Sequence, residues 1–288
     1  MDTVLAEIEE WLKSMLVPAV MEKLTSMFNS INSEVGSIAS DVGTTPYGFS
    51  PSIFNMIRNI SETVIMPIAG IILTFIACYE LIQLIVSYNN LANFETWFIF
   101  KWVFKTAIAV TLITHTFDFT MAVFDVAQHV INSSGGLIAG STAVDASALA
   151  AMEATIEAMN PFAIFGMWLQ LSIIDVLTWI LSKLIFVIIY CRMIEIYMYV
   201  SLAPIPFATF GNKEQSMIGQ NYMRSLFALG FQGFLIMICV GIYAMLVSSI
   251  SFSSDIIGSV WGMVGYTLLL AFSIFKTGSI ARSILQAH

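Results

Sequence analysis

Residues 162–210 decide the fold of this chain, and they read FAIFGMWLQLSIIDVLTWILSKLIFVIIYCRMIEIYMYVSLAPIPFATF. About 40 residues precede the first proline of this stretch, and nearly all of them are apolar. One unbroken helix over 162–202 would be roughly 60 Å long, whereas a hydrocarbon core of about 30 Å needs only some 20 residues. The stretch is therefore either one long helix that projects beyond the bilayer or two spans joined by a tight turn near residues 182–183.

The apolar stretch ends at Pro204 and Pro206, which lack backbone N–H groups and disfavour a helix in the residues before them. A short polar segment, 211–224, separates this end from the next apolar run. We expect the segment around the prolines to be a loop at the cytoplasmic face of the membrane, and its marked residues are Pro204, Pro206, Lys213, Glu214 and Arg224.

The composition is that of an integral membrane protein. The 288 residues are 58% hydrophobic and only 10% charged, whereas a soluble domain carries about 25% charged residues. The net charge is −8, and the basic stripe of a protein that grips nucleic acid directly is absent. The three cysteines lie inside apolar segments, which predicts neither disulfides nor a metal cluster. We predict an all-α, polytopic membrane helix bundle.

The N-terminal residues 1–31 are predicted to form an amphipathic helix rather than a span. It either lies on the bilayer surface or packs against neighbouring subunits, and its acidic polar face favours protein contact. Residues 32–52 are rich in Ser, Gly, Thr and Pro and are predicted to be a loop. This gives three parts, an amphipathic helix (1–31), a linker (32–60) and a transmembrane helical domain (61–288).

Five spans are predicted when the long central element is counted once, and the other four are 64–86, 106–129, 226–247 and 257–275. Trp97 and Trp102, with Lys101 and Lys105 nearby, mark residues 91–104 as a segment at the membrane boundary.

The distribution of basic residues predicts the topology. Residues 131–161 contain no Lys or Arg, which places them outside, whereas Lys213, Arg224, Lys276 and Arg282 mark cytoplasmic segments. Five spans then put the N-terminus outside and the C-terminus in the cytoplasm. Splitting the central element would place the base-free segment and Lys213 on the same side, so one long helix is favoured.

A polar stripe follows the predicted second span. His115, Asp118, Asp125 and His129 are spaced by three, seven and four residues and share one helix face. Ionisable groups at membrane depth usually face a bundle interior or water. A metal site needs three or four converging ligands and is the least favoured reading, followed by a proton relay. We favour a polar seam that other helices satisfy or that lines a wet cavity.

Other charges within the apolar runs are predicted to form ion pairs. Glu80, Asp175 and Lys183 are the intramembrane set, in which Lys183 meets a carboxylate of another helix, either Glu80 or Asp118. Arg192 and Glu195 are three residues apart and are able to pair on the helix surface. No nucleophile elbow, phosphate-binding loop or metalloprotease motif is present. The sequence predicts no enzyme and no cofactor, and it leaves room for bound phospholipid.

Three stretches carry a resemblance to a known family: MDTVLAEIEEWLKSML, IMPIAGIILTFIACYELI and, above all, YVSLAPIPFATFGNKEQSMIGQNYMRSLFALGFQGFLIMICVGIYA. The chain resembles the TrbL/VirB-type polytopic subunit of type IV secretion, in the compact form of Gram-positive conjugative elements. The resemblance covers essentially the whole chain, and 201–233 is its most specific part.

The resemblance implies a cytoplasmic-membrane channel or scaffold subunit that supports conjugal transfer of relaxase-bound single-stranded DNA. It also implies a homo-oligomeric ring, with five copies as the suggested number. The implied partners are other secretion subunits, including cytoplasmic ATPases, and transiently the relaxase or single-stranded DNA itself. The alternative is an ion- or proton-conducting transporter that uses the polar stripe as its pathway, and such proteins are typified by inverted repeats and broken helices.

Overall fold

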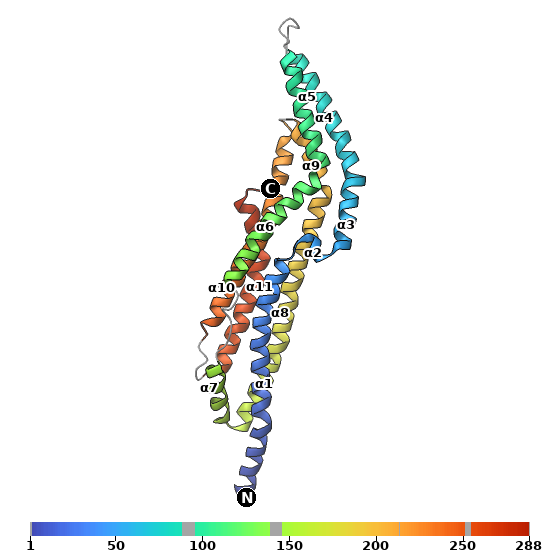
Figure 1. Ribbon diagram of the computed structural model, residues 1–288. Coiled ribbons are helices and arrows are strands. Elements are labelled where there is room, and N and C mark those ends of the chain that lie inside the picture. Colours follow the sequence, from blue (N-terminus) through green and yellow to red (C-terminus); the bar gives the residue numbers. More distant parts are fainter. Residues whose placement is uncertain (1, 88–95, 139–145, 213, 251–254, 288) are drawn as a thin grey trace. The chain divides into compact units, whose positions relative to one another are not determined.

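The computed structural model describes residues 2–87, 96–138, 146–212, 214–250 and 255–287, and every regular element in these residues is helical (Figure 1). Five helical stretches among them are long and apolar enough to cross a membrane: Pro51–Val86, Trp97–Thr114, Pro161–Gly211, Ser216–Ser248 and Ile256–Ile284. The predicted all-α membrane bundle with five spans is confirmed. By contact the chain divides into two units, residues 1–43, 132–189 and 235–276, and residues 44–131, 190–234 and 277–288.

The central element is one helix. α8 runs without interruption over Pro161–Leu202, so the alternative of two spans with a turn near 182–183 is wrong. At 1.5 Å per residue, its 42 residues measure about 63 Å, twice the bilayer core. The helix ends where the prolines predicted, and a short helix, α9 (Pro204–Ala208), and a 3₁₀ turn (Thr209–Gly211) follow it.

The N-terminal helix is longer than the sequence indicated. α1 spans Asp2–Val42 and continues through Pro18, so the loop predicted to start at residue 32 begins only after Val42. Apolar residues recur along one face of α1 at helical spacing and are buried in the first unit: Val17, Val20, Leu24, Met27, Ile31, Val35, Ile38 and Val42. This packing holds residues 32–42 in a helix although their Ser and Gly content is typical of a loop.

The first unit also contains the initial part of α8, the helix α7 (Ala146–Glu157), the second half of α10 (Ser216–Ser248) and most of α11 (Ile256–Ile284). Three polar contacts join α1 to its neighbours: Lys13 Nζ donates to the Glu157 carbonyl, Lys23 pairs with Asp175, and Ser182 donates to Glu34. Figure 1 shows α1 and α8 running side by side in this unit.

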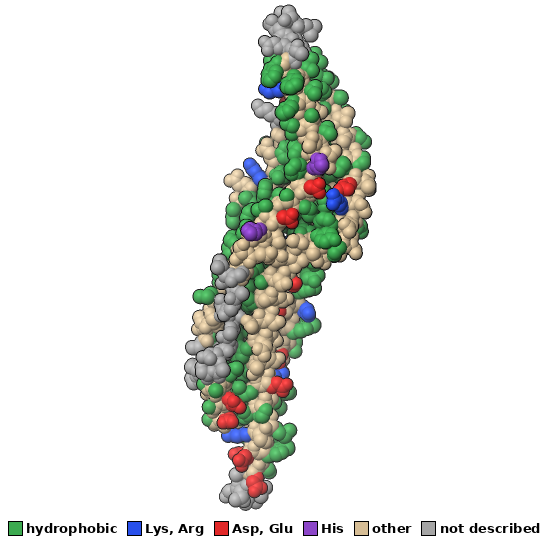
Figure 2. Space-filling view, viewed as in Figure 1, with side chains coloured by type: hydrophobic (Ala, Val, Ile, Leu, Met, Phe, Trp, Pro, Cys, Tyr) green, Lys and Arg blue, Asp and Glu red, His purple; other side chains and the backbone are tan. Residues whose placement is uncertain are grey.

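The second unit begins with α2 (Pro46–Phe49) and α3 (Pro51–Ile60). A π-helical turn (Ser61–Ile65) joins α3 to α4 (Met66–Ser87), so helix replaces most of the predicted linker up to residue 60. α5 (Thr96–Thr114) and α6 (Thr116–Ile138) come next, and the ends of α8 and α11 and the start of α10 complete this unit. Hydrophobic side chains gather on the exposed face of α4, where Ile71 and Phe75 are more than 70% exposed (Figure 2). Such a face suits lipid contact.

The second span differs from the prediction. The helix is interrupted at His115, and the apolar stretch before it, Trp97–Thr114, is the candidate span in place of 106–129. The aromatic residues predicted to lie at the boundary, Trp97 and Trp102, therefore lie in the first turns of this span. Threonine hydroxyls on both sides of the interruption bond back to the preceding turn, as Thr114 does to Val110 O and Thr116 to Leu112 O. Back-bonding of this kind bends helices.

Candidate functional site

The four residues of the polar stripe lie at the start of α6 and along it. His115 is at the interruption, and Asp118, Asp125 and His129 follow on α6, with all four side chains exposed. The opposite face of α6 is buried, since Phe117 and Phe124 pack into a core with Met193 and Tyr197 of α8. Figure 2 shows histidine and acidic side chains over α6. α6 is not among the candidate spans, so the stripe belongs to the helix after the second span.

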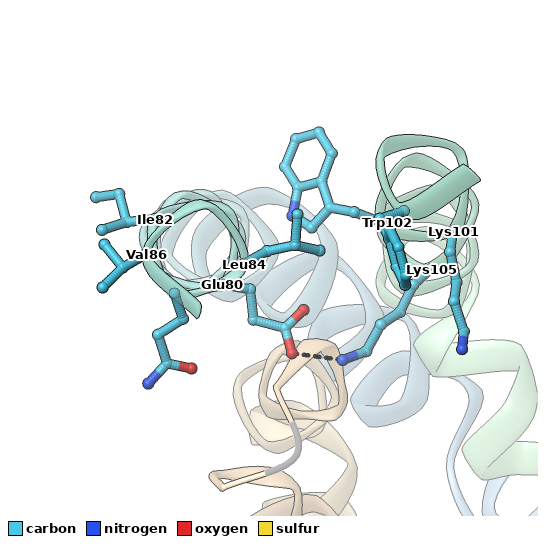
Figure 3. Close-up of a pocket in the computed structure, with 9 residues that line it drawn as sticks. Glu80, Ile82, Leu84, Val86, Lys101, Trp102 and Lys105 are labelled. Atoms are coloured by element: carbon cyan, nitrogen blue, oxygen red, sulfur yellow. Dashed lines mark hydrogen bonds and ion pairs between the residues drawn. The ribbon is translucent and has the colours of Figure 1, made fainter. Parts of the chain in front are cut away.

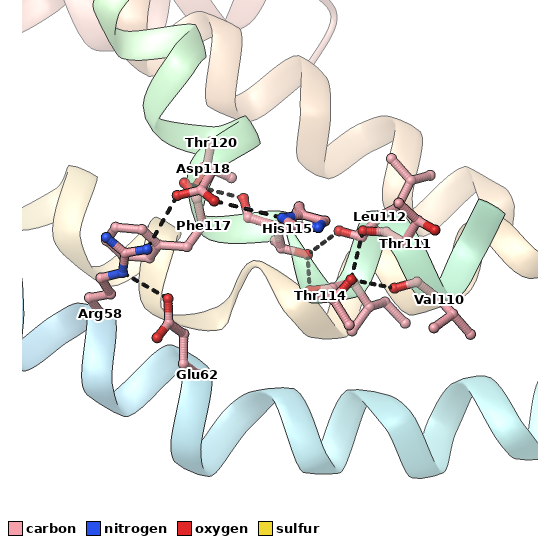
Figure 4. Close-up of polar contacts among 12 residues, drawn as sticks. Arg58, Glu62, Val110, Thr111, Leu112, Thr114, His115, Phe117, Asp118 and Thr120 are labelled. Atoms are coloured by element: carbon pink, nitrogen blue, oxygen red, sulfur yellow. Dashed lines mark hydrogen bonds and ion pairs between the residues drawn. The ribbon is translucent and has the colours of Figure 1, made fainter. Parts of the chain in front are cut away.

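A cation that was not predicted from the sequence, Arg58, lies beside the stripe. Arg58 of α3 donates from Nε to Glu62 Oε1 at 2.8 Å, and its Nη2 lies 3.5 Å from Asp118 Oδ1 (Figure 4). Asp118 in turn has its Oδ2 3.8 Å from His115 Nδ1. The guanidinium also stands over the Phe117 ring, 5.3 Å from its centroid. The Arg–x–x–x–Glu spacing of residues 58 and 62 was the available signal, but it fell across the end of the predicted linker at residue 60.

These contacts favour a charged cluster rather than a metal centre. Among the described residues, no three His, Cys, Asp or Glu side chains converge in a way that could hold a metal ion. Asp118 is instead shared between a histidine and an arginine, and its side chain is 63% exposed. Exposed pairs of this kind contribute little to stability, so their charges remain available for a partner or for water.

The predicted intramembrane charges find partners within each unit. Asp175 Oδ2 lies 2.7 Å from Lys23 Nζ, and Glu80 Oε1 lies 2.5 Å from Lys105 Nζ. Lys183 stands over the Phe186 ring, 5.9 Å from its centroid. Lys183 belongs to the first unit and Glu80 to the second, so a pairing between them stays a prediction.

The Asp175 pair borders a polar cavity of about 400 Å³ in the first unit. Glu34 accepts a hydrogen bond from Ser182 Oγ at 2.5 Å, and Tyr243 Oη lies 3.1 Å from Thr267 Oγ1. Hydroxyl groups supply most of the remaining polar lining: Ser26, Ser30, Ser33 and Thr178. This cavity could not be predicted from the sequence, because α1 was not expected to pack beside α8.

Arg192 is buried instead of pairing on the helix surface. Its side chain is 5% exposed, Nη2 donates to the Gly230 carbonyl at 3.4 Å, and Nε has no hydrogen-bond partner. Glu195 forms its ion pair with Arg282 of α11. The predicted Arg192–Glu195 surface pair is therefore wrong, because Arg192 lies on the face of α8 that packs against α10.

The segment after α8 is tightly built. Pro204 is buried, and Thr209 Oγ1 donates to the Pro206 carbonyl at 2.7 Å and accepts from the Gly219 N–H at 3.0 Å. A Cβ on Gly219 would lie 2.8 Å from the Pro206 carbonyl oxygen, so only glycine fits there. Glu214 and Arg224 are exposed, and Lys213 lies outside the described residues. The exposed side chains of Glu214 and Arg224 thus lie next to a hydrogen-bonded, closely packed turn.

The family comparison covers most of the membrane helices described above. A family model described as TrbL/VirB6 plasmid conjugal transfer like protein matches residues 31–204, which run from α1 to the end of α8. No curated protein and no solved structure matches the chain.

Proposed function

Because the chain belongs to the TrbL/VirB6 plasmid conjugal transfer-like family, we propose that it is a channel or scaffold subunit of a type IV secretion system in the cytoplasmic membrane. In this role it supports the transfer of relaxase-bound single-stranded DNA, and cytoplasmic ATPases supply the energy. The family match over residues 31–204 is the observation that carries the proposal. Five candidate spans agree with a multi-pass membrane subunit.

Deletion of the coding sequence from its conjugative element tests the proposal directly. We expect transfer of the element to recipient cells to be lost and to return when the intact chain is supplied in trans. Undiminished transfer without the chain contradicts the proposed function.

A candidate for part of the lining of this passage is the exposed face of α1, which packs beside the span α8 although α1 is not itself among the candidate spans. This face carries one carboxylate, Glu22, among uncharged polar side chains. α8 exposes apolar side chains beside it, among them Ile173, Val176 and Ile180. A weakly polar wall suits a moving polyanion, because a basic groove would bind its phosphates tightly. The residues of the polar face are Thr25, Ser26, Asn29, Ser30 and Ser33.

Substitution within this face tests the lining. Ser30→Lys introduces a cation that would hold phosphate groups, so we expect transfer to fall while the amount of protein in the membrane stays constant. Ser30→Thr keeps the hydroxyl and serves as the control. Equal transfer by both variants contradicts the lining but leaves the proposed function in place.

The proposed assembly is a ring of identical copies, for which five is the expected number. The first turns of α1 support an intersubunit role, since Trp11 and Met15 are more than half exposed. Projection images of the detergent-solubilised protein are expected to show rings, and images of monomers alone contradict the ring.

The proposed topology has the N-terminus outside and the C-terminus in the cytoplasm. The segment that holds Pro204, Pro206, Lys213, Glu214 and Arg224 is proposed to meet the ATPases through its exposed side chains, such as Glu214 and Arg224, since Pro204 is buried. Single cysteines at 145 and 213, in a background without Cys78, Cys191 and Cys239, are expected to react with impermeant maleimide from opposite sides. Labelling of both from the same side contradicts this threading.

A second candidate function is ion or proton conduction along the α6 stripe. The observation that favours it is the chain of exposed ionisable groups at Arg58, Asp118 and His115 (Figure 4). Proton flux into liposomes that contain only this protein, abolished by Asp118→Asn, supports conduction. Absence of flux contradicts conduction, and the secretion role is then the remaining candidate.

A further inference from the structure

A cavity of about 780 Å³ lies along α4 and α5 in the second unit. Its polar lining comes from Glu80 and Gln83 of α4 and from Lys101, Trp102 and Lys105 of α5. The Trp102 indole N–H donates to the Ala77 carbonyl at 3.1 Å, which fixes the ring between the two helices (Figure 3). The cavity is thus lined by two helices that a hydrogen bond holds together.

The charges of this cavity do not cancel. Lys105 Nζ lies 2.5 Å from Glu80 Oε1, so these two groups neutralise each other. Lys101 is one turn away on α5, its side chain is exposed, and it forms no ion pair or hydrogen bond within the described part of the chain. Figure 3 shows both lysine side chains reaching to the same side of the helix pair as Glu80. Among the described residues that line the cavity, one positive charge is left over, which favours a ligand with one net negative charge.

The surroundings of the cavity are those of a membrane boundary. One candidate span ends at Val86 and the next begins at Trp97, so Lys101 lies within a turn or so of the end of the span. Trp97 stacks on Phe100 with ring centroids 5.6 Å apart, and both rings are about 60% exposed. Indole rings prefer the headgroup level of a bilayer. Ile82, Leu84 and Phe98 supply apolar walls.

We propose that this cavity binds one anionic phospholipid, with the phosphate at Lys101 and Lys105 and the acyl chains along the apolar walls. The ligand is a glycerophospholipid whose headgroup carries no positive charge. A zwitterionic headgroup brings an ammonium group that needs an acidic partner, and Glu80 is already engaged by Lys105. Basic pockets between membrane helices are suited to such headgroups.

The experiment measures lipid retention by the full chain in detergent, with native mass spectrometry after incubation with phosphatidylglycerol or phosphatidylcholine. We expect selective retention of phosphatidylglycerol by the unmodified protein. Lys101→Gln is expected to weaken it by about tenfold, the loss of one charge-assisted contact. Lys101→Arg is expected to preserve it. Lys183→Gln removes a lysine that lies over Phe186, outside the cavity, and is the matched control.

Two further measurements distinguish a phospholipid from free phosphate and test whether the variant is folded. Millimolar inorganic phosphate is expected not to displace the lipid, because the apolar walls contribute to its binding. Circular dichroism of Lys101→Gln is expected to match that of the unmodified protein. Three results overturn the proposal. The first is equal retention of the two lipids by the unmodified protein, and the second is equal retention of phosphatidylglycerol by Lys101→Gln and the unmodified protein. The third is displacement of the lipid by free phosphate.

Discussion

Asp175 on α8 and Lys23 on α1 form an ion pair, with 2.7 Å between Oδ2 and Nζ, and the same ammonium group stands over the Trp168 ring, 5.6 Å from its centroid. The two residues are separated by 152 positions in the chain. This pair therefore fixes the register of α1 along α8.

The first prediction concerns this pair. Lys23→Gln and Asp175→Asn are each expected to lower the free energy of unfolding by about 1 kcal/mol, because both side chains are only partly exposed and each variant leaves one charge without its partner. Thermal unfolding in detergent measures the change. The double variant, Lys23→Gln with Asp175→Asn, is expected to lose less than the sum of the two single changes, and strict additivity contradicts the coupling.

The second prediction concerns the close approach of α10 to α8 and α6. A Cβ on Gly233 would lie 2.5 Å from Ile131 Cδ1 and 2.7 Å from Arg192 Nη2. Both atoms end flexible side chains that can move aside in part, so Gly233→Ala is expected to destabilise the protein by about 1 kcal/mol, the low end of the range typical of overpacking. Gly262→Ala is the control, since nothing lies within 4 Å of a Cβ at that position. Equal melting temperatures for the two variants contradict the packing at Gly233.

The third prediction concerns the buried guanidinium of Arg192. It makes one long hydrogen bond and leaves Nε unpartnered, so its desolvation is poorly compensated. Arg192→Met, which keeps a long flexible side chain, is expected to leave the melting temperature unchanged or to raise it. If stability is preserved while conjugal transfer is lost, the charge serves the function of the protein. A large fall in stability shows instead that the arginine is a structural anchor.

The fourth prediction concerns the hydrogen bond from Tyr197 Oη to the Pro46 carbonyl, which measures 2.5 Å and joins α8 to the start of α2. Tyr197 is 4% exposed, so Tyr197→Phe leaves a carbonyl group with one hydrogen bond fewer in an apolar surrounding. We expect a loss of about 1–3 kcal/mol in thermal unfolding. Tyr47→Phe, at a side chain that is 56% exposed, is the comparison and is expected to be neutral.

The features that sequence alone predicted are those with strong local causes. The long α8 follows from an apolar run with no proline before Pro204, and its end follows from that proline and Pro206. The number of spans follows from hydrophobicity in the same way. The shared face of Asp118 and Asp125 follows from helical spacing.

The features that sequence missed depend on packing between distant segments. Residues 32–42 have the composition of a loop, yet Val35 and Ile38 are buried and keep the helix intact. The interruption at His115 lies between two threonines that bond back to the preceding turn, a local feature that hydrophobicity does not report. The polar cavity was missed because it requires α1 to lie beside α8. Arg58 was missed because its partner Asp118 is 60 residues away.

The π-helical turn at Ser61–Ile65 sets the angle at which α3 presents its side chains. Such a turn takes up one residue more than an α-helical turn, so the helices on either side of it stay in phase. Loss of Val64 would therefore restore regular α-helix and leave Arg58 still facing Asp118. The same deletion within α4, where no wider turn absorbs it, would rotate Arg58 by about 100° and separate the two side chains, although every charge remains in the protein.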